Sequence, residues 1–445
     1  MMNVHFFVPL FGGPDVSQMV VSFGPIKNFN WFWCAETLAL IGALIVLNVR
    51  GIRESSLLNE IIGIFVMVAE SLIILLGFMF AFRPDLLSQQ WTEWVAKPNL
   101  NHFMYGASLA IISFVGLESI SQAAQETRRP ATIVPRTSIA LIFSVFIFAV
   151  AFSTLAIGVH LKPETLPASH HLVTSGVIST HGHASVRITE PWQIVAAHLE
   201  NPIAVVAGAI PLIGEFAAAF AAALGALILL ISANSGVMSV SRVTYSMSQF
   251  NFVSKWFRAV HPRHRTPVRT IWVFSGIGAL QVILSFLSPS APDTLANMYA
   301  FGASLGYTLV FIALMRLRFK DPYSPRPYKV PLNLRLKRRD GRVVQFPILG
   351  VIGLLGISTI FFLVVWTHDI GRIAGPAWVI LCFCYYAWYR RSQKLPVFKS
   401  MPREWEKEQM EVLESAEEYD LLEQYKVALA ERDRRRGRES AGETR

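Results

Sequence analysis

The chain has 445 residues, of which 53% are hydrophobic and only 16% are charged, and its mean hydropathy is +0.43. Soluble domains hold about 25% charged residues, so this composition excludes an ordinary soluble protein and predicts a chain whose main solvent is lipid. The net charge of +10 does not indicate nucleic-acid binding, because the Lys and Arg residues cluster in short connections between apolar runs, as they do when they set membrane orientation.

Residues 1–30 do not resemble a signal peptide, because they hold several helix-breaking residues and only one Lys. We predict an extracytoplasmic segment there. The three cysteines, Cys34, Cys382 and Cys384, lie in apolar runs and form no CxxC pair, so neither a disulfide framework nor a zinc site is predicted.

A membrane-spanning helix needs about 20 mostly apolar residues, because lipid cannot satisfy the backbone N–H and C=O groups and the helix must pair them itself. About nine segments meet this requirement, so we predict an all-α membrane protein with a transmembrane domain over residues 31–390. The fifth segment, which contains Pro211 and Glu215, is the least regular. The segments are 31–49, 57–82, 103–122, 136–159, 208–240, 268–288, 295–316, 346–366 and 372–390.

The connections after the first, third, fifth and seventh segments are basic, whereas the alternate ones are poor in Lys and Arg. The positive-inside bias makes the basic connections cytoplasmic, which places the N-terminus outside and the C-terminus inside. The external connection 160–202 holds six histidines without a carboxylate or Cys at ligand spacing. We therefore favour a solvated loop over a metal site there, and we predict no metal and no cofactor.

The tail, residues 391–445, is polar, and we predict a cytoplasmic helix from about 403 to 436. An acidic run precedes four arginines between 432 and 436, which is the order that suits a helix dipole. Trp405, Val412 and Tyr419 recur every seven residues. A solvated helix and a docking or pairing helix both stay open.

Glu118 is the strongest functional candidate, because an ionisable group inside a span is costly and is a functional candidate by default. It follows the stretch 112–117, where a Ser and a Gly stand among apolar residues in the middle of the span. Such a composition is typical of a discontinuous helix whose freed backbone groups bind substrate. The alternative is a Glu that reaches the inner interface or pairs with a basic loop residue.

Two further polar positions lie inside spans. Glu70 is in the middle of the second segment, where an unpaired carboxyl group would hold a proton and act as a relay; a neutral Glu bonded to a neighbouring helix is the alternative. Asn234 and Ser235 belong to a small polar cluster in the fifth segment, which either lines a pathway, where the two side chains contact substrate, or lets helices pack closely. Headgroup exposure explains the carboxylates nearer span ends, Glu36, Glu60 and Glu215.

Four stretches, in order along the chain, resemble the amino acid-polyamine-organocation superfamily of transporters. The family's turn between helices four and five is similar to Asn48–Ser55, and its helix six with the following loop is similar to Ser113–Ser119 and Glu126–Pro130. Its helix eight and the exit from that helix are similar to Ser241–Met247 and His261–Arg263. Its loop after helix ten is similar to Arg316–Arg318 and Arg326–Pro331.

This resemblance implies the inverted-repeat, LeuT-like fold, with the nine segments corresponding to helices four to twelve. That register also requires an external start, as the charge bias does. In the family, substrate lies between the unwound middles of helices one and six. The resemblance makes Glu118 a proton-linked residue, although Ile112 stands where the arginine/agmatine exchangers have a gating tryptophan. It places substrate contacts at Ile112, Ser113, Phe114, Val115 and Gly116.

The implied function is a secondary transporter of amino acids or related organic cations such as polyamines, by proton coupling or exchange, in the cell membrane. Its partners are a small-molecule substrate and the lipid bilayer, not nucleic acid. Nothing resembles helices one to three, so the alternative is a truncated, non-transporting remnant or a membrane subunit that needs a separately encoded N-terminal part. An enzyme is not predicted, since the only cluster of catalytic residue types is the His-containing connection.

Overall fold

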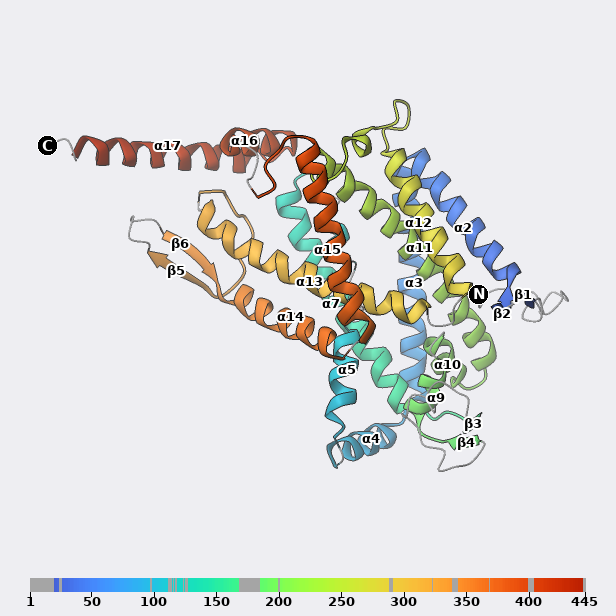
Figure 1. The fold of residues 1–445 in the computed structure, drawn as a ribbon. Helices are drawn as coiled ribbons and strands as arrows, with labels where there is room; N and C mark the ends of the chain where they lie inside the picture. The colour runs from blue at the N-terminus through green and yellow to red at the C-terminus, as the bar shows by residue number, and fades with distance from the viewer. Residues whose placement is uncertain are drawn as a thin grey trace. The chain divides into compact units, whose positions relative to one another are not determined.

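The computed structural model places the chain in a set of helices and three short two-stranded sheets (Figure 1). It divides into two compact units, which are described separately. The described residues are 20–442 except 24–25, 97, 111–113, 115, 117, 123, 125–126, 168–184, 199–200, 288–290, 322, 338–342, 368 and 399–403.

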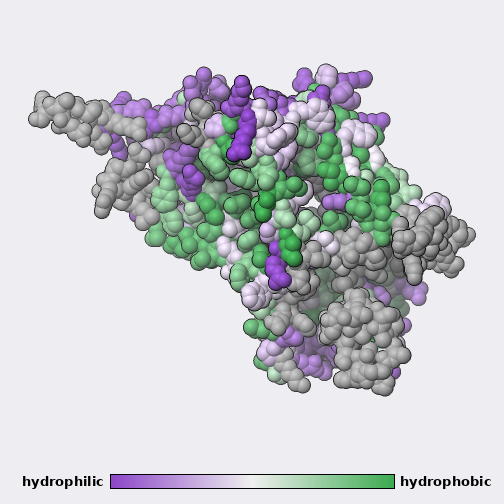
Figure 2. Space-filling model, viewed as in Figure 1, coloured by the Kyte–Doolittle hydropathy of each residue, from purple (hydrophilic) through white to green (hydrophobic). Residues whose placement is uncertain are grey.

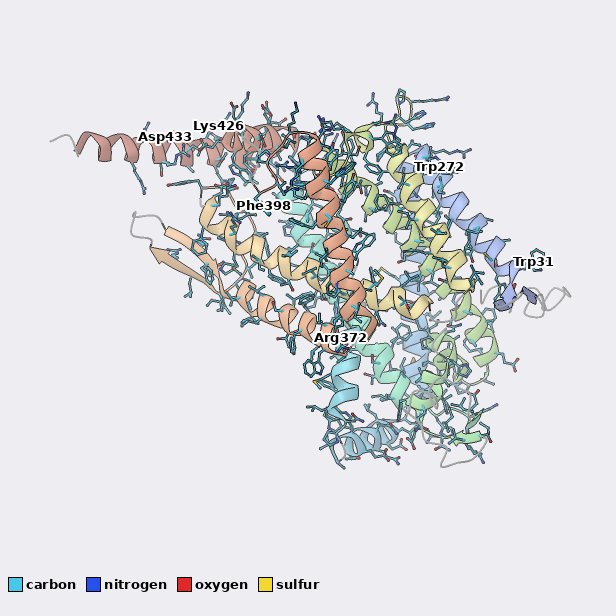
Figure 3. The ribbon with its side chains drawn as sticks, in the orientation of Figure 1. Trp31, Trp272, Arg372, Phe398, Lys426 and Asp433 are labelled. Atoms are coloured by element: carbon cyan, nitrogen blue, oxygen red, sulfur yellow. The ribbon has the colours of Figure 1, made fainter. Side chains whose placement is uncertain are left out.

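The first unit comprises Met1–Asn99, Ser144–Tyr245 and Trp256–Pro289. Asn30 fixes the start of its first long helix, because the Asn30 side chain accepts a hydrogen bond from the backbone N–H of Trp33 at 3.1 Å. Trp31 and Trp272, labelled in Figure 3, lie on α2 and α12 of this unit. Its elements are β1 (Val20–Phe23), β2 (Ile26–Asn30), α2 (Trp31–Arg50), α3 (Ile52–Leu76), η2 (Gly77–Ala81), α4 (Pro84–Ala96), β3 (Glu164–Pro167), β4 (Ser185–Ile188), α9 (Pro191–Ala197), α10 (Pro202–Gly208), η5 (Lys255–Arg258), α12 (Val268–Leu287), and most of α11 (Gly214–Gln249).

Small side chains form much of the core of the first unit. Ala69 of α3 packs with Ala204 and Ala207 of α10 and with Ala217 and Ala221 of α11, all of them buried. Alanines let helix backbones approach closely, which is how helices associate in lipid, where no hydrophobic force drives them together. A similarly close approach occurs where α7 (Pro130–Gly158) ends against η2, because a Cβ at Gly77 would lie 3.1 Å from the Leu155 side chain.

The second unit comprises Leu100–Phe143, Ser246–Lys255 and Ser290–Arg445. Its core joins Ala300 and Phe301 to Ile357 and Val364. Gly353 permits this packing, because a Cβ there would lie 2.6 Å from the Phe311 ring. Its elements are α5 (Leu100–Ala110), α6 (Glu118–Gln122), the start of α7, α13 (Ala291–Lys320), β5 (Asn333–Lys337), β6 (Val343–Pro347), α14 (Ile348–Thr367), α15 (Asp369–Ser392), α16 (Trp405–Ser415) and α17 (Tyr419–Gly442).

Seven helices in the described part of the chain are long and apolar enough to cross a membrane. They correspond to seven of the nine predicted segments, all but the third and the ninth. The third segment, 103–122, is divided between α5 and α6, and the ninth forms α15, whose Tyr, Trp and Arg residues lower its hydropathy. Hydrophobic residues cover much of the face drawn in Figure 2. On α3, for example, Ile61, Ile64 and Val68 are exposed. This is the pattern expected of helices that face lipid.

The tail differs from its prediction in one respect. It forms two helices instead of one, because the chain turns between α16 and α17, where Glu417 has a positive φ of 60°. A positive φ is rare for a residue with a side chain and cannot continue a right-handed helix. The Trp405, Val412 and Tyr419 repeat is divided between α16 and α17, and the buried residues of the tail are others, such as Leu413 and Tyr425, whereas Val412 and Tyr419 are exposed.

Candidate functional site

The predicted interruption of the third segment is present. α5 ends at Ala110, and the next helix, α6, begins at Glu118. Gly116 takes a φ of +113°, a conformation that residues with a side chain rarely adopt, and its C=O accepts a hydrogen bond from the Ser119 N–H at 3.0 Å. A residue at this φ cannot continue a right-handed helix, so the main-chain polar groups of Gly116 need partners outside a helical ladder.

Glu118 joins this interruption to another helix. One of its carboxylate oxygens, Oε2, accepts a hydrogen bond from the Gly116 N–H at 2.9 Å and another from the Tyr307 hydroxyl at 2.5 Å. Tyr307 lies on α13. Charge-assisted bonds to a carboxylate are shorter and stronger than neutral ones, so this oxygen ties the broken segment to α13.

Tyr307 was not among the sequence-predicted residues. A signal for it exists, because Tyr307 adjoins Gly306 in the middle of an apolar segment, and a buried phenol needs a hydrogen-bond partner. The identity of that partner lies 189 positions away in the sequence, beyond the reach of any local pattern.

The other predicted contacts of the broken segment are only partly described. Phe114 is exposed. Ile112, Ser113 and Val115 lie outside the described residues.

Asn234 and Ser235 lie on α11 in the first unit, where they belong to a buried polar network with α2 and α3. The Asn234 side-chain Oδ1 accepts hydrogen bonds from Asn48 Nδ2 at 2.6 Å and from Ser55 Oγ at 3.1 Å. Its Nδ2 donates to Asn59 Oδ1 at 2.8 Å and to Ser55 Oγ at 2.9 Å. Ser235 Oγ accepts from Asn59 Nδ2 at 3.0 Å. Both polar atoms of the Asn234 amide are therefore used by neighbouring helices.

Glu70 lies on α3 in the first unit and is partly buried. It adjoins Ala69 and comes three residues before Ile73, both of which belong to the apolar core. Among the described residues, its carboxyl group has no hydrogen-bond partner. The Gly116–Glu118 pair belongs to the second unit, so the predicted site residues divide between the two units.

Replacing Gly116 by Ala is expected to destabilise the interruption, because a side chain at a φ of +113° costs about 1–3 kcal/mol. The measurement is the thermal midpoint of unfolding of the purified protein in detergent. Gly106→Ala is the matched control, because Gly106 is helical and has open space around its Cβ position, so that change should be neutral or stabilising. Equal midpoints for the two variants would contradict the strain at Gly116.

Several curated transporters are similar to this chain. The branched-chain amino acid permease BcaP of Bacillus subtilis is 25% identical over 308 residues, which cover 69% of this chain and 57% of the relative. The methylthioribose transporter of the same organism is 23% identical over 330 residues, or 74% of this chain and 59% of the relative. The mouse cationic amino acid transporter 4 is 26% identical over 276 residues, or 62% of this chain and 37% of the relative.

The chain thus spans less than two thirds of the length of each of these relatives. A family model describes a longer stretch of it. The model for amino acid permeases matches residues 6–387, which include the apolar helices, the interruption at Gly116 and both members of the Glu118–Tyr307 pair. On this match the chain is an integral membrane protein and belongs to the amino acid permease family.

Proposed function

We propose that the protein is a secondary transporter that moves amino acids or related organic cations across the cell membrane, by proton coupling or exchange. The observation that carries this proposal is the interruption at Gly116, together with the Glu118 carboxylate that bonds to both Gly116 and Tyr307. The names of the relatives support an amino acid substrate, since two of them are a branched-chain and a cationic amino acid transporter.

The substrate binds at the interruption in this proposal. A zwitterion presents a carboxylate and an ammonium group, which main-chain N–H and C=O groups bind without a dedicated charged side chain. We assign these contacts to the backbone around Gly116 and to the side chains beside it. The residues are Ile112, Ser113, Phe114, Val115 and Gly116.

Glu118 couples a proton to this site. When charged, its Oε2 atom holds both Gly116 and Tyr307. Protonation weakens both charge-assisted bonds, and this frees the broken segment from α13. Proton binding and the movement of a helix are then one event, as transport requires. Glu70 is a second candidate for proton transfer, because its carboxyl group lies within a long apolar helix.

Asn234 and Ser235 were predicted to contact substrate or to pack helices, and in this proposal they pack helices. Because the Asn234 amide is fully bonded to Asn48, Ser55 and Asn59, we assign it to holding α11 against α2 and α3. A transporter that rocks one bundle of helices against another needs each bundle to stay rigid. The basic connections place the C-terminus in the cytoplasm in this scheme.

The proposal is tested with the purified chain in liposomes. We expect uptake of radiolabelled leucine or radiolabelled arginine above that of protein-free liposomes, with saturation and with competition by the unlabelled amino acid. These two probes represent an apolar and a cationic amino acid. An acidic outside should stimulate uptake if a proton moves with the substrate. Failure of the reconstituted chain to take up or exchange either probe would overturn the proposal.

A further inference from the structure

The tail helices α16 and α17 pack against the rest of the second unit. Leu413, Leu421, Leu422 and Tyr425 form a buried cluster, and Tyr425 is only 1% exposed. Ala131 at the start of α7 and Tyr323, which follows α13, pack against this cluster. The tail therefore contacts two segments that are far apart in the sequence.

The first attachment is at the start of α7. The Ala131 N–H lies in the first turn of that helix, where backbone donors have no intrahelical partner. The tail supplies one, because the Glu418 carboxylate accepts a hydrogen bond from the Ala131 N–H at 3.1 Å and is 4% exposed. A carboxylate at a helix N-terminus caps it and complements its dipole. The Arg129 N–H donates to the Ala416 carbonyl at 3.1 Å.

Two ion pairs add to this attachment but contribute little. Arg128 lies 3.7 Å from Glu417, and Arg129 lies 3.6 Å from Asp420. All four side chains are at least half exposed, and solvent screens such pairs. The buried Glu418 is consequently the residue that defines this end of the contact.

The second attachment is at the exit of α13. The Trp405 indole N–H donates to Asp321 Oδ2 at 2.9 Å, and Lys320 lies over the Trp405 ring at 5.2 Å. Asp321 is held in turn by the Ser324 N–H, which donates to its Oδ1 at 3.1 Å. Arg432 of α17 bonds to Glu406 of α16, so the two tail helices are joined to each other.

The Glu118–Tyr307 bond joins α6 to α13, and the tail joins the start of α7, the next helix along the chain, to the exit of α13. Ala131 follows Glu118 by 13 residues, and Asp321 follows Tyr307 by 14 residues, about 21 Å along a helix. α13 is thus connected once to α6, through the carboxylate, and once to the start of α7, through the tail. Movement of α6 and α7 together away from α13 requires that both connections give way.

We propose that the α16–α17 tail is a strap that ties the start of α7 to the exit of α13 and thereby restrains the separation of Glu118 from Tyr307. This inference rests on the proposed transport function. The strap slows the movement of α7 away from α13 at the end of the protein where the tail lies. When this opening is the slowest step of the transport cycle, release of the strap raises the rate of transport.

The strap is tested by changing one residue at each attachment. Glu418→Ala removes the cap of α7, and Trp405→Phe removes the indole bond to Asp321. Glu411→Ala is the matched control, because Glu411 is exposed on α16 and has no side-chain contact among the described residues. Tail docking is followed by the rate of trypsin cleavage in α17, whose residues include Lys426 (Figure 3). Transport is followed by uptake of leucine and arginine in liposomes.

We expect Glu418→Ala and Trp405→Phe each to raise cleavage and initial uptake by about fivefold, the effect of one lost helix cap or one lost hydrogen bond, with Glu411→Ala at the wild-type values. Thermal midpoints show whether the transmembrane helices stay folded. Faster cleavage with unchanged or slower uptake in a protein of unchanged midpoint would overturn the strap while leaving the proposed function intact. Unchanged cleavage would also overturn it. Absence of uptake by the wild type would instead overturn the proposed function, and the strap with it.

Discussion

Replacing Glu118 by Gln is expected to abolish the response of uptake to a pH gradient. A gradient of about one pH unit is worth about 1.4 kcal/mol per proton, enough for about tenfold accumulation of a substrate that moves with one proton. Gln keeps the size of the side chain and can still accept hydrogen bonds from Gly116 and Tyr307, but it cannot take up a proton. Accumulation driven by an acidic outside should therefore fall to the level without a gradient. Exchange of labelled for unlabelled amino acid at equal pH should persist.

Two further variants test whether the loss of the pH-gradient response arises from the Glu118 carboxyl group itself. Glu60→Gln makes the same chemical change at an exposed position on α3 and should keep the gradient response. Tyr307→Phe removes the hydroxyl that donates to Glu118 but leaves the carboxyl group, so the gradient should still drive accumulation. If Glu118→Gln accumulates substrate as well as the wild type does, Glu118 has no part in coupling.

The positions of the helices followed from the sequence because each span must satisfy its own backbone in lipid. This requirement makes a run of about 20 apolar residues visible without any knowledge of its neighbours. The interruption was predictable for a related reason, since Ser113 and Gly116 are poor choices for the middle of such a run. The positive φ at Gly116 agrees with that prediction.

The partners of the polar groups were not predictable. Glu118 and Tyr307 lie 189 positions apart, and Asn48 and Asn234 lie 186 apart. A local pattern shows that a polar side chain in lipid needs a partner, but it does not show which helix supplies one. The turn at Glu417 was not predicted for a similar reason. Helix propensity favours a continuous helix at a Glu, whereas the positive φ of Glu417 occurs together with the distant contacts that bury Leu413 and Tyr425.

Asn234→Ala is expected to lower the stability of the protein by about 2–4 kcal/mol, because it leaves several buried polar groups without their partner. Asn234 itself is 0% exposed, and so is Ser55, which bonds to both of its amide atoms. Asn48 Nδ2 and Asn59 Oδ1 also lose a bond, of 2.6 Å and 2.8 Å respectively. The thermal midpoint in detergent should fall by at least about 3 °C.

Asn234→Asp is the sharper version of this test. It preserves the shape of the side chain but replaces its donor group with an acceptor, which then faces the Asn59 Oδ1 atom that accepted a hydrogen bond from it. A buried carboxylate opposite an acceptor costs more than a small cavity, so the midpoint should fall at least as far as in Asn234→Ala. Ser235→Ala removes only the single bond from Asn59 at 3.0 Å and should cost much less. If Asn234→Ala instead raised the KM for uptake and left the midpoint unchanged, Asn234 would contact the substrate, and the three helices α2, α3 and α11 would owe their packing to their apolar residues alone.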